Sequence, residues 1–138
     1  QGKYEEADRL YLRCIEIQER GLGPDHPELA ASLNNRAGLL KAQGKLDEAD
    51  PLLVRAVDIQ ERALGPDHPS VANSLGTRAI VLEAQGKYEE ADRLYLRCIE
   101  IEERGLGPDH PKLAASLNNR AGLLKAQGKL DEADPLLV

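Results

Sequence analysis

The 138-residue sequence contains no phenylalanine, tryptophan or methionine, and only four tyrosines. A packed interior must therefore be built almost entirely from aliphatic side chains, which are plentiful here. The sequence also lacks an uninterrupted run of about 18 apolar residues, so it predicts no membrane span and no membrane partner. No stretch has the features of a secretory signal.

Basic residues are in the minority. The chain has 18 lysines and arginines against 24 acidic residues, which gives a net charge of −6. A nucleic-acid binder needs a basic stripe that neutralises phosphates, so the composition argues against a nucleic-acid partner. Charges of both signs are interspersed along the chain, as is typical of the solvated faces of helices.

The sequence repeats itself with a period of 42 residues. The pentapeptide Gly-Pro-Asp-His-Pro begins at residues 23, 65 and 107, and Gln-Gly-Lys begins at 1, 43, 85 and 127. A period of this length predicts a solenoid, in which each unit stacks only on its neighbours. Solenoids usually work as binding surfaces rather than as catalysts.

A longer period of 84 residues lies above the shorter one. Residues 1–42 and 43–84 are identical at 25 of 42 positions, whereas residues 1–54 and 85–138 are identical at 52 of 54. The two exceptions are Gln18, which is replaced by Glu102, and Glu28, which is replaced by Lys112. The larger unit is therefore a pair of unlike repeats, and we expect residues 1–138 to be part of a longer array.

Each repeat predicts two helices joined by short turns. Leucine and alanine recur at helical spacing, and Gly-Lys or Gly-Pro segments interrupt the pattern. In the Gly65–Pro69 loop, Gly65 is expected to end one helix, Asp67 to cap the next, and Pro69 to occupy its first turn. Pro51 is expected close to a helix start. The predicted helices span 4–20, 27–43, 46–62, 69–85, 88–104 and 111–127, with a truncated helix from 130.

Three segments carry a resemblance to a known family: Ser-Leu-Asn-Asn-Arg-Ala-Gly-Leu-Leu-Lys-Ala-Gln-Gly-Lys (32–45), Leu-Asp-Glu-Ala-Asp-Pro-Leu-Leu (46–53) and Leu-Gly-Pro-Asp-His-Pro (64–69). They resemble the tetratricopeptide repeat in its 42-residue variety, found in kinesin light chain. The resemblance recurs along the whole chain. It implies an all-α fold, a right-handed α-α superhelix of antiparallel helix pairs, with about three repeats forming a single domain over 1–138.

In that family, one face of the first helix of each repeat lines a concave groove where partners bind. The positions on this face differ between the unlike repeats, whereas the core positions do not. Small residues would keep the groove open, and amides could bind the backbone of an extended peptide. The alternative is that these are solvated polar positions without a ligand. The candidate groove residues are Asn34, Gly38, Lys41, Asn73, Ile80, Glu83, Asn118, Gly122 and Lys125.

One arginine recurs where the family usually has a large apolar residue, at Arg36, Arg78 and Arg120. A charge beside an apolar stripe must be paired or reach water. Acidic residues recur on the second helices and could form an ion-pair ladder with these arginines; the two series are Asp8, Asp50 and Asp92, and Glu16, Asp58 and Glu100. The competing interpretation is that the arginines bind a ligand carboxylate or phosphate.

Other residues that could suggest chemistry are weak candidates. Each repeated Asp-His loop offers at most two metal ligands, so we expect no metal site. Cys14 and Cys98 occupy the position of Ala56 in the alternate repeat, so we expect buried, unpaired thiols and a reducing, cytoplasmic compartment. The four tyrosines are expected to be packing residues. We expect no cofactor and no enzymatic activity.

Two functions remain open at this point. The first is a scaffold that binds a peptide or an extended protein segment in the concave groove. The second is a structural spacer that self-associates end to end into rods or filaments, because an uncapped solenoid exposes an apolar face at each end.

Overall fold

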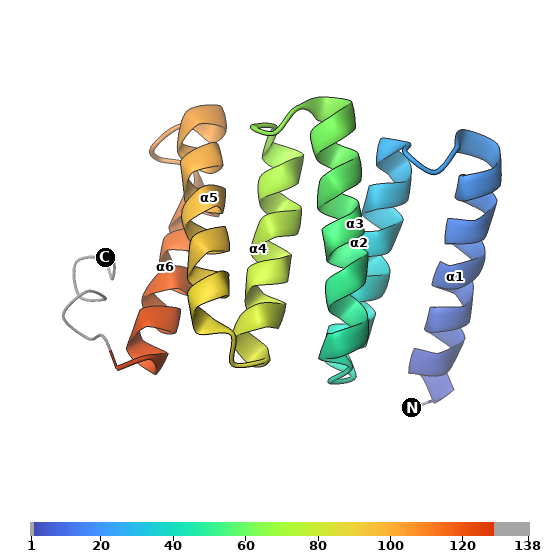
Figure 1. Ribbon diagram of the computed structural model, residues 1–138, viewed down its shortest axis with the longest axis horizontal. Coiled ribbons are helices and arrows are strands. Elements are labelled where there is room, and N and C mark those ends of the chain that lie inside the picture. Colours follow the sequence, from blue (N-terminus) through green and yellow to red (C-terminus); the bar gives the residue numbers. More distant parts are fainter. Residues whose placement is uncertain (1, 129–138) are drawn as a thin grey trace. The chain divides into compact units, whose positions relative to one another are not determined.

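The computed structural model of the chain describes residues 2–128, and Figure 1 shows that the described part is all helical. The predicted helices are confirmed, with ends that agree to within two residues; the helix expected from residue 130 lies outside the described residues. The six helices are α1 (Gly2–Leu22), α2 (Pro27–Ala42), α3 (Leu46–Leu64), α4 (Pro69–Ala84), α5 (Tyr88–Leu106) and α6 (Pro111–Ala126).

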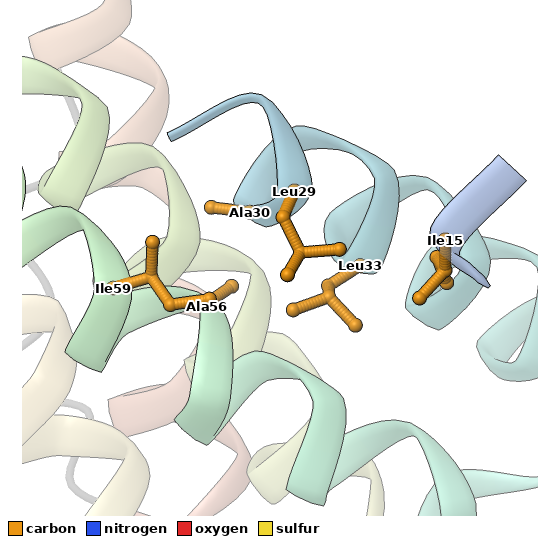
Figure 2. Packing of buried hydrophobic residues seen from close by; sticks show 6 residues of the cluster. All are labelled: Ile15, Leu29, Ala30, Leu33, Ala56 and Ile59. Carbon is orange, nitrogen blue, oxygen red and sulfur yellow. The ribbon is translucent and has the colours of Figure 1, made fainter. Parts of the chain in front are cut away.

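The chain divides into two compact units, Gln1–Pro66 and Asp67–Val138. In the first unit, α2 packs against both α1 and α3, and successive helices run in opposite directions (Figure 1). Figure 2 shows its core: Leu29 and Leu33 of α2 lie among side chains of the two neighbouring helices. Fully buried leucines of this kind each contribute about 1.5–3 kcal/mol of transfer free energy. The cluster consists of Ile15, Leu29, Ala30, Leu33, Ala56 and Ile59.

In the second unit, α5 packs against both α4 and α6. Its core joins Ala79 and Leu82 of α4, Tyr95 of α5 and Leu123 of α6. Tyr95 is 1% exposed and is the largest fully buried side chain of the described residues. Its hydroxyl donates a hydrogen bond to Oε1 of Glu83 at 3.0 Å, so the polar end of the ring is satisfied inside the unit.

The first helix of each repeat begins with a histidine cap, not with the aspartate cap that the sequence predicted. Nδ1 of His26 accepts the backbone N–H of Glu28 at 3.1 Å, and Nδ1 of His68 accepts that of Ser70 at 3.0 Å. The expected role of Asp67 is therefore wrong. The imidazole acceptor reaches the N2 amide from the N-cap position, and Pro69 follows at N1, where no N–H is needed.

The turn from the first to the second helix of a repeat requires glycine. Gly44 has a φ of +78° and Gly86 a φ of +82°, in the left-handed region that other residues avoid. The backbone N–H of the following residue returns to the helix, so that Lys45 donates to the carbonyl of Leu40 at 2.8 Å. This closure satisfies helix-terminal carbonyls and fixes the antiparallel pair.

Pro51 lies further inside its helix than the sequence analysis expected. Helix α3 begins at Leu46, so Pro51 is in its second turn and cannot donate to the carbonyl of Asp47. The helix nevertheless continues to Leu64. Packing of its apolar face, including the buried Ala49 and Leu53, holds the helix together across the proline.

Two expectations about burial hold for the second unit but not for the first. Cys98 is buried, whereas Cys14 is exposed, and both thiols are free. Tyr95 is buried, whereas its counterpart Tyr11 is half-buried; Tyr4 is 43% exposed, whereas its counterpart Tyr88 is half-buried. The reason is that α5 has two neighbouring helices within its unit, while α1 packs mainly on α2. Identical sequence therefore has different surroundings in the two units.

Candidate functional site

A small open pocket of about 190 Å³ lies in the second unit. Its walls come from α4 and α6, which are both first helices of a repeat, and α5 supplies its floor. The lining combines small and aliphatic side chains with amide, hydroxyl and charged ones. The lining residues are Ala72, Asn73, Gly76, Thr77, Ile80, Cys98, Glu102, Lys112, Ala115, Ser116 and Asn119.

The predicted groove face of α4 is part of this lining. Asn73, Gly76 and Ile80 all line the pocket, and Asn73 is exposed. A Cβ added at Gly76 would meet Sγ of Cys98 at 3.5 Å, which is an ordinary contact distance. Glu83, one turn further on, is half-buried and accepts the hydrogen bond of Tyr95 instead.

The other predicted groove residues lie elsewhere. On α6, Asn118, Gly122 and Lys125 are exposed but do not line the pocket. The pocket uses the opposite flank of α6, namely the residues at 112, 115, 116 and 119, which are spaced on one face of a helix. Each first helix therefore has two flanks that can line a groove, and the sequence comparison identified only one. On α2, Gly38 and Lys41 are exposed and Asn34 is half-buried.

A buried carboxylate forms part of the pocket floor. Glu102 is only 6% exposed, and Oγ of Ser116 donates to its Oε1 at 2.6 Å. The first unit has the same arrangement with an amide: Oγ of Ser32 donates to Oε1 of Gln18, also at 2.6 Å. The hydrogen bond is thus the same whether the acceptor belongs to glutamine or to glutamate.

The thiol beside this carboxylate is part of the packed floor. Sγ of Cys98 donates to the carbonyl oxygen of Ala72 at 3.2 Å and lies 3.6 Å from Oγ of Ser116. Burial raises the pKa of the Cys98 thiol to about 11, from an ordinary value of 9.0. The reactive thiolate is therefore scarce at neutral pH.

The repeated arginines all contact carboxylates. Nε of Arg36 donates to Asp8 at 2.7 Å, and a second, longer contact of 3.4 Å makes the pair bidentate. Arg120 and Asp92 repeat both distances. Arg78 contacts Glu90 at 3.3 Å. The three arginine side chains are only 17–20% exposed, so each guanidinium lies largely within the helix packing.

The second series of acidic residues pairs differently. Asp58 contacts Arg62 and Glu100 contacts Arg104, each within its own helix. The same two arginines also reach the loop aspartates, Arg62 to Asp25 at 3.5 Å and Arg104 to Asp67 at 4.0 Å. The side chains of these pairs are more than half exposed, so water screens their attraction and they contribute little to stability.

In the Asp-His loops, the histidines cap the following helices, and Asp25 and Asp67 form exposed ion pairs. Within residues 2–128 there is no group of three or more histidine, cysteine, aspartate or glutamate side chains placed to hold a metal ion. Over the same residues, none of the helices has the length and apolar character needed to cross a membrane.

Sequence reasoning missed much of the pocket. Asn119, Ser116 and Lys112 lie on the flank of α6 that the groove prediction did not include, and Glu102 lies on α5. A signal was nevertheless present. The only two positions at which residues 1–54 and 85–138 differ place Glu102 and Lys112 in the second copy, and both line this one pocket.

Comparison with known proteins gives one family. The model of the tetratricopeptide repeat matches residues 1–53, 29–104 and 76–137, which together span nearly the whole chain. None of the curated proteins compared with the chain matches it.

Solved structures give the same fold. A Podosopora anserina protein assigned as a kinesin light chain, with nearly identical TPR-like repeats, is 33% identical with a TM-score of 0.88, and a single-residue variant of that protein gives the same values. BtubC (BKLC) from P. vanneervenii is 20% identical, with a TM-score of 0.90. Each match covers 99% of this chain. The chain spans 64% of the length of the Podosopora anserina protein and 54% of that of BtubC. The all-α helical-repeat fold expected from the sequence is confirmed.

Proposed function

Because the chain belongs to the tetratricopeptide-repeat family, of the kinesin-light-chain type, we propose that it is a protein-interaction scaffold that binds an extended segment of a partner. The binding surface in the second unit is the groove between α4 and α6. The observation that carries this proposal is the composition of the pocket, where Asn73 and Asn119 line an open space together with the small residues Gly76 and Ala115.

The lining suits a peptide because it offers both polar and apolar contacts. Each asparagine can donate and accept, as a peptide backbone requires. Gly76 and Ala115 leave room for a backbone to approach, and Ile80 offers apolar contact to a side chain. Extended peptides in grooves gain affinity from main-chain hydrogen bonds and specificity from pockets for their side chains.

The test uses peptides selected on the immobilised chain from a random library displayed on phage. The variant Gly76→Leu places a side chain in the pocket, since a Cβ at this position fits against Cys98. Gly122→Leu is the matched control, because it lies on α6 outside the lining and a Cβ there meets nothing within 4 Å. Leucine favours helix over glycine in both variants.

We expect Gly76→Leu to lower the affinity for the selected peptides about tenfold or more, and Gly122→Leu to leave this affinity unchanged. Both variants should have the circular dichroism of the native chain. Selection that retains no peptide, or equal affinities in the two variants, would refute groove binding.

Self-association is a second candidate function, and one specific observation favours it. Leu10 and Ile17 of α1 are 64% and 57% exposed, whereas Ile101, the counterpart of Ile17, is 1% exposed. A second copy could cover this apolar face of α1. Light scattering over a wide range of protein concentration tests this. Growth that disappears in the Leu10→Lys/Ile17→Lys variant supports it, and a monomer at every concentration excludes it.

A further inference from the structure

The chemistry of the pocket between α4 and α6 is set by two residues, Glu102 and Lys112. Residues 85–138 copy residues 1–54 at every other position, so the copies differ here and nowhere else. Both side chains line the same pocket. The two differences between the copies therefore meet in one place, and this is the observation from which the inference starts.

The hydrogen bond that Glu102 makes does not require its charge. Gln18 makes the equivalent hydrogen bond to Ser32 at 2.6 Å, the distance between Glu102 and Ser116. A neutral amide can therefore accept the same hydrogen bond from serine. Burying a carboxylate instead costs free energy unless the charge is paired.

Glu102 has capacity for a further partner. Ser116 donates to one of its oxygens, and a carboxylate has about four acceptor sites. Within residues 2–128, no lysine, arginine or histidine lies in ion-pair contact with this side chain. The carboxylate of Glu102 is thus largely buried, at 6% exposure, and it forms part of the floor of an open pocket.

The stability of helix α6 does not explain why a lysine occurs at position 112. Lys112 lies in the first turn of α6, where the helix dipole favours acidic residues, and the first copy has Glu28 at this position. A lysine here opposes the dipole, so its presence fits a role in the pocket. A positive charge at the rim repels a uniformly basic segment and leaves room for a single basic residue flanked by neutral or acidic ones.

We propose that this pocket receives one lysine or arginine side chain of an extended peptide segment, and that the cationic group pairs with Glu102. The proposal rests on the proposed groove function and names the residue type that the groove selects. Lysine and arginine can span the depth of such a pocket with their methylenes against Ile80 and Ala115 and reach the floor with the charge. A charge pair sheltered from water is worth more than one at the surface.

The experiment sequences the peptides that the native chain retains from the random phage library and measures their affinities for two variants. Glu102→Gln installs the residue of the first copy and removes the charge. Glu103→Gln is the matched control, because it removes the same charge from the exposed neighbouring position and tests general attraction to an acidic protein. Urea unfolding should give the same midpoint for Glu102→Gln as for the native chain, within error, or a higher one.

The expected result is a lysine or arginine at one position of the selected peptides, with affinity about tenfold lower for Glu102→Gln and unchanged for Glu103→Gln. Peptides that depend on Gly76 but lack a basic residue, or that bind Glu102→Gln equally well, overturn this inference and leave the groove function standing. If no selected peptide depends on Gly76, the groove function fails and this inference fails with it.

Discussion

The same isoleucine occurs in nearly the same sequence in two helices, and its environment differs between them. Ile101 in α5 is 1% exposed and Ile17 in α1 is 57% exposed. Residues 4–17 and 88–101 are identical, so intrinsic helix propensity is the same at both positions. Replacement by alanine therefore compares packing alone.

The magnitude follows from burial. Ile101→Ala removes a fully buried side chain and should cost about 3 kcal/mol, within the range of about 2–5 kcal/mol for such changes. Ile17→Ala should cost about 1 kcal/mol or less, since less than half of the side chain is buried. With an m-value of about 2 kcal/mol/M in urea, the midpoints should fall by about 1.5 M and by no more than about 0.5 M.

The assay is urea unfolding followed by circular dichroism, with hydrogen exchange to assign the loss to α4–α6 in the Ile101→Ala variant. Equal shifts for the two variants would refute the reasoning, because they would mean that neighbouring helices do not set the difference. If Ile17→Ala is costly only at high protein concentration, a second copy covers α1 and the self-association function gains support.

Substitutions also test the helix caps, the ion pairs and the buried thiol. His68→Ala should lower stability by about 1 kcal/mol and His68→Asn by less, because asparagine is a good N-cap; thermal unfolding measures both, and equal losses would argue against the cap. We propose that the repeated arginines are structural, so Arg120→Ala and Asp92→Ala should each cost about 1–2 kcal/mol and show a coupling near ~1 kcal/mol in a double-mutant cycle, whereas additive losses would exclude the pair. The raised pKa of Cys98 means that the folded state favours the protonated thiol. Its stabilising contribution is therefore complete below pH 9.0 and is lost as the pH rises towards about 11, and the urea midpoint of Cys98→Ala should fall less over this range. In the native chain a thiol reagent should modify Cys14 well before Cys98.

The sequence predicted the helices well because three local signals agree. Aliphatic spacing, glycine after each helix and proline in the first turn of α2, α4 and α6 mark the same boundaries, as at Gly44 and Pro69. The histidine caps were missed because aspartate is the commoner capping residue, and only the backbone geometry places Nδ1 of His68 over the N2 amide.

The candidate site was only partly predictable. Periodicity places Asn73 and Ile80 on one face of a helix, because a helical face is a local property, and the family resemblance implies that this face lines a groove. The participation of Asn119 depends on which flank of α6 faces the pocket, and that of Glu102 on how α5 packs against α4 and α6; both depend on tertiary structure. The exposure of Cys14 had the same cause: sequence identity with Cys98 says nothing about how many helices surround each of them.

Gln18 and Glu102 occupy equivalent positions in the two copies, and this has a consequence for how the repeats of such arrays can diverge in sequence. The two side chains differ by one atom, an amide nitrogen against an oxygen, and keep the same hydrogen bond to serine. A repeat can therefore change the charge of its groove by one unit without repacking its interior. Copies of one scaffold could then be given different ligand preferences, position by position, while every copy folds in the same way.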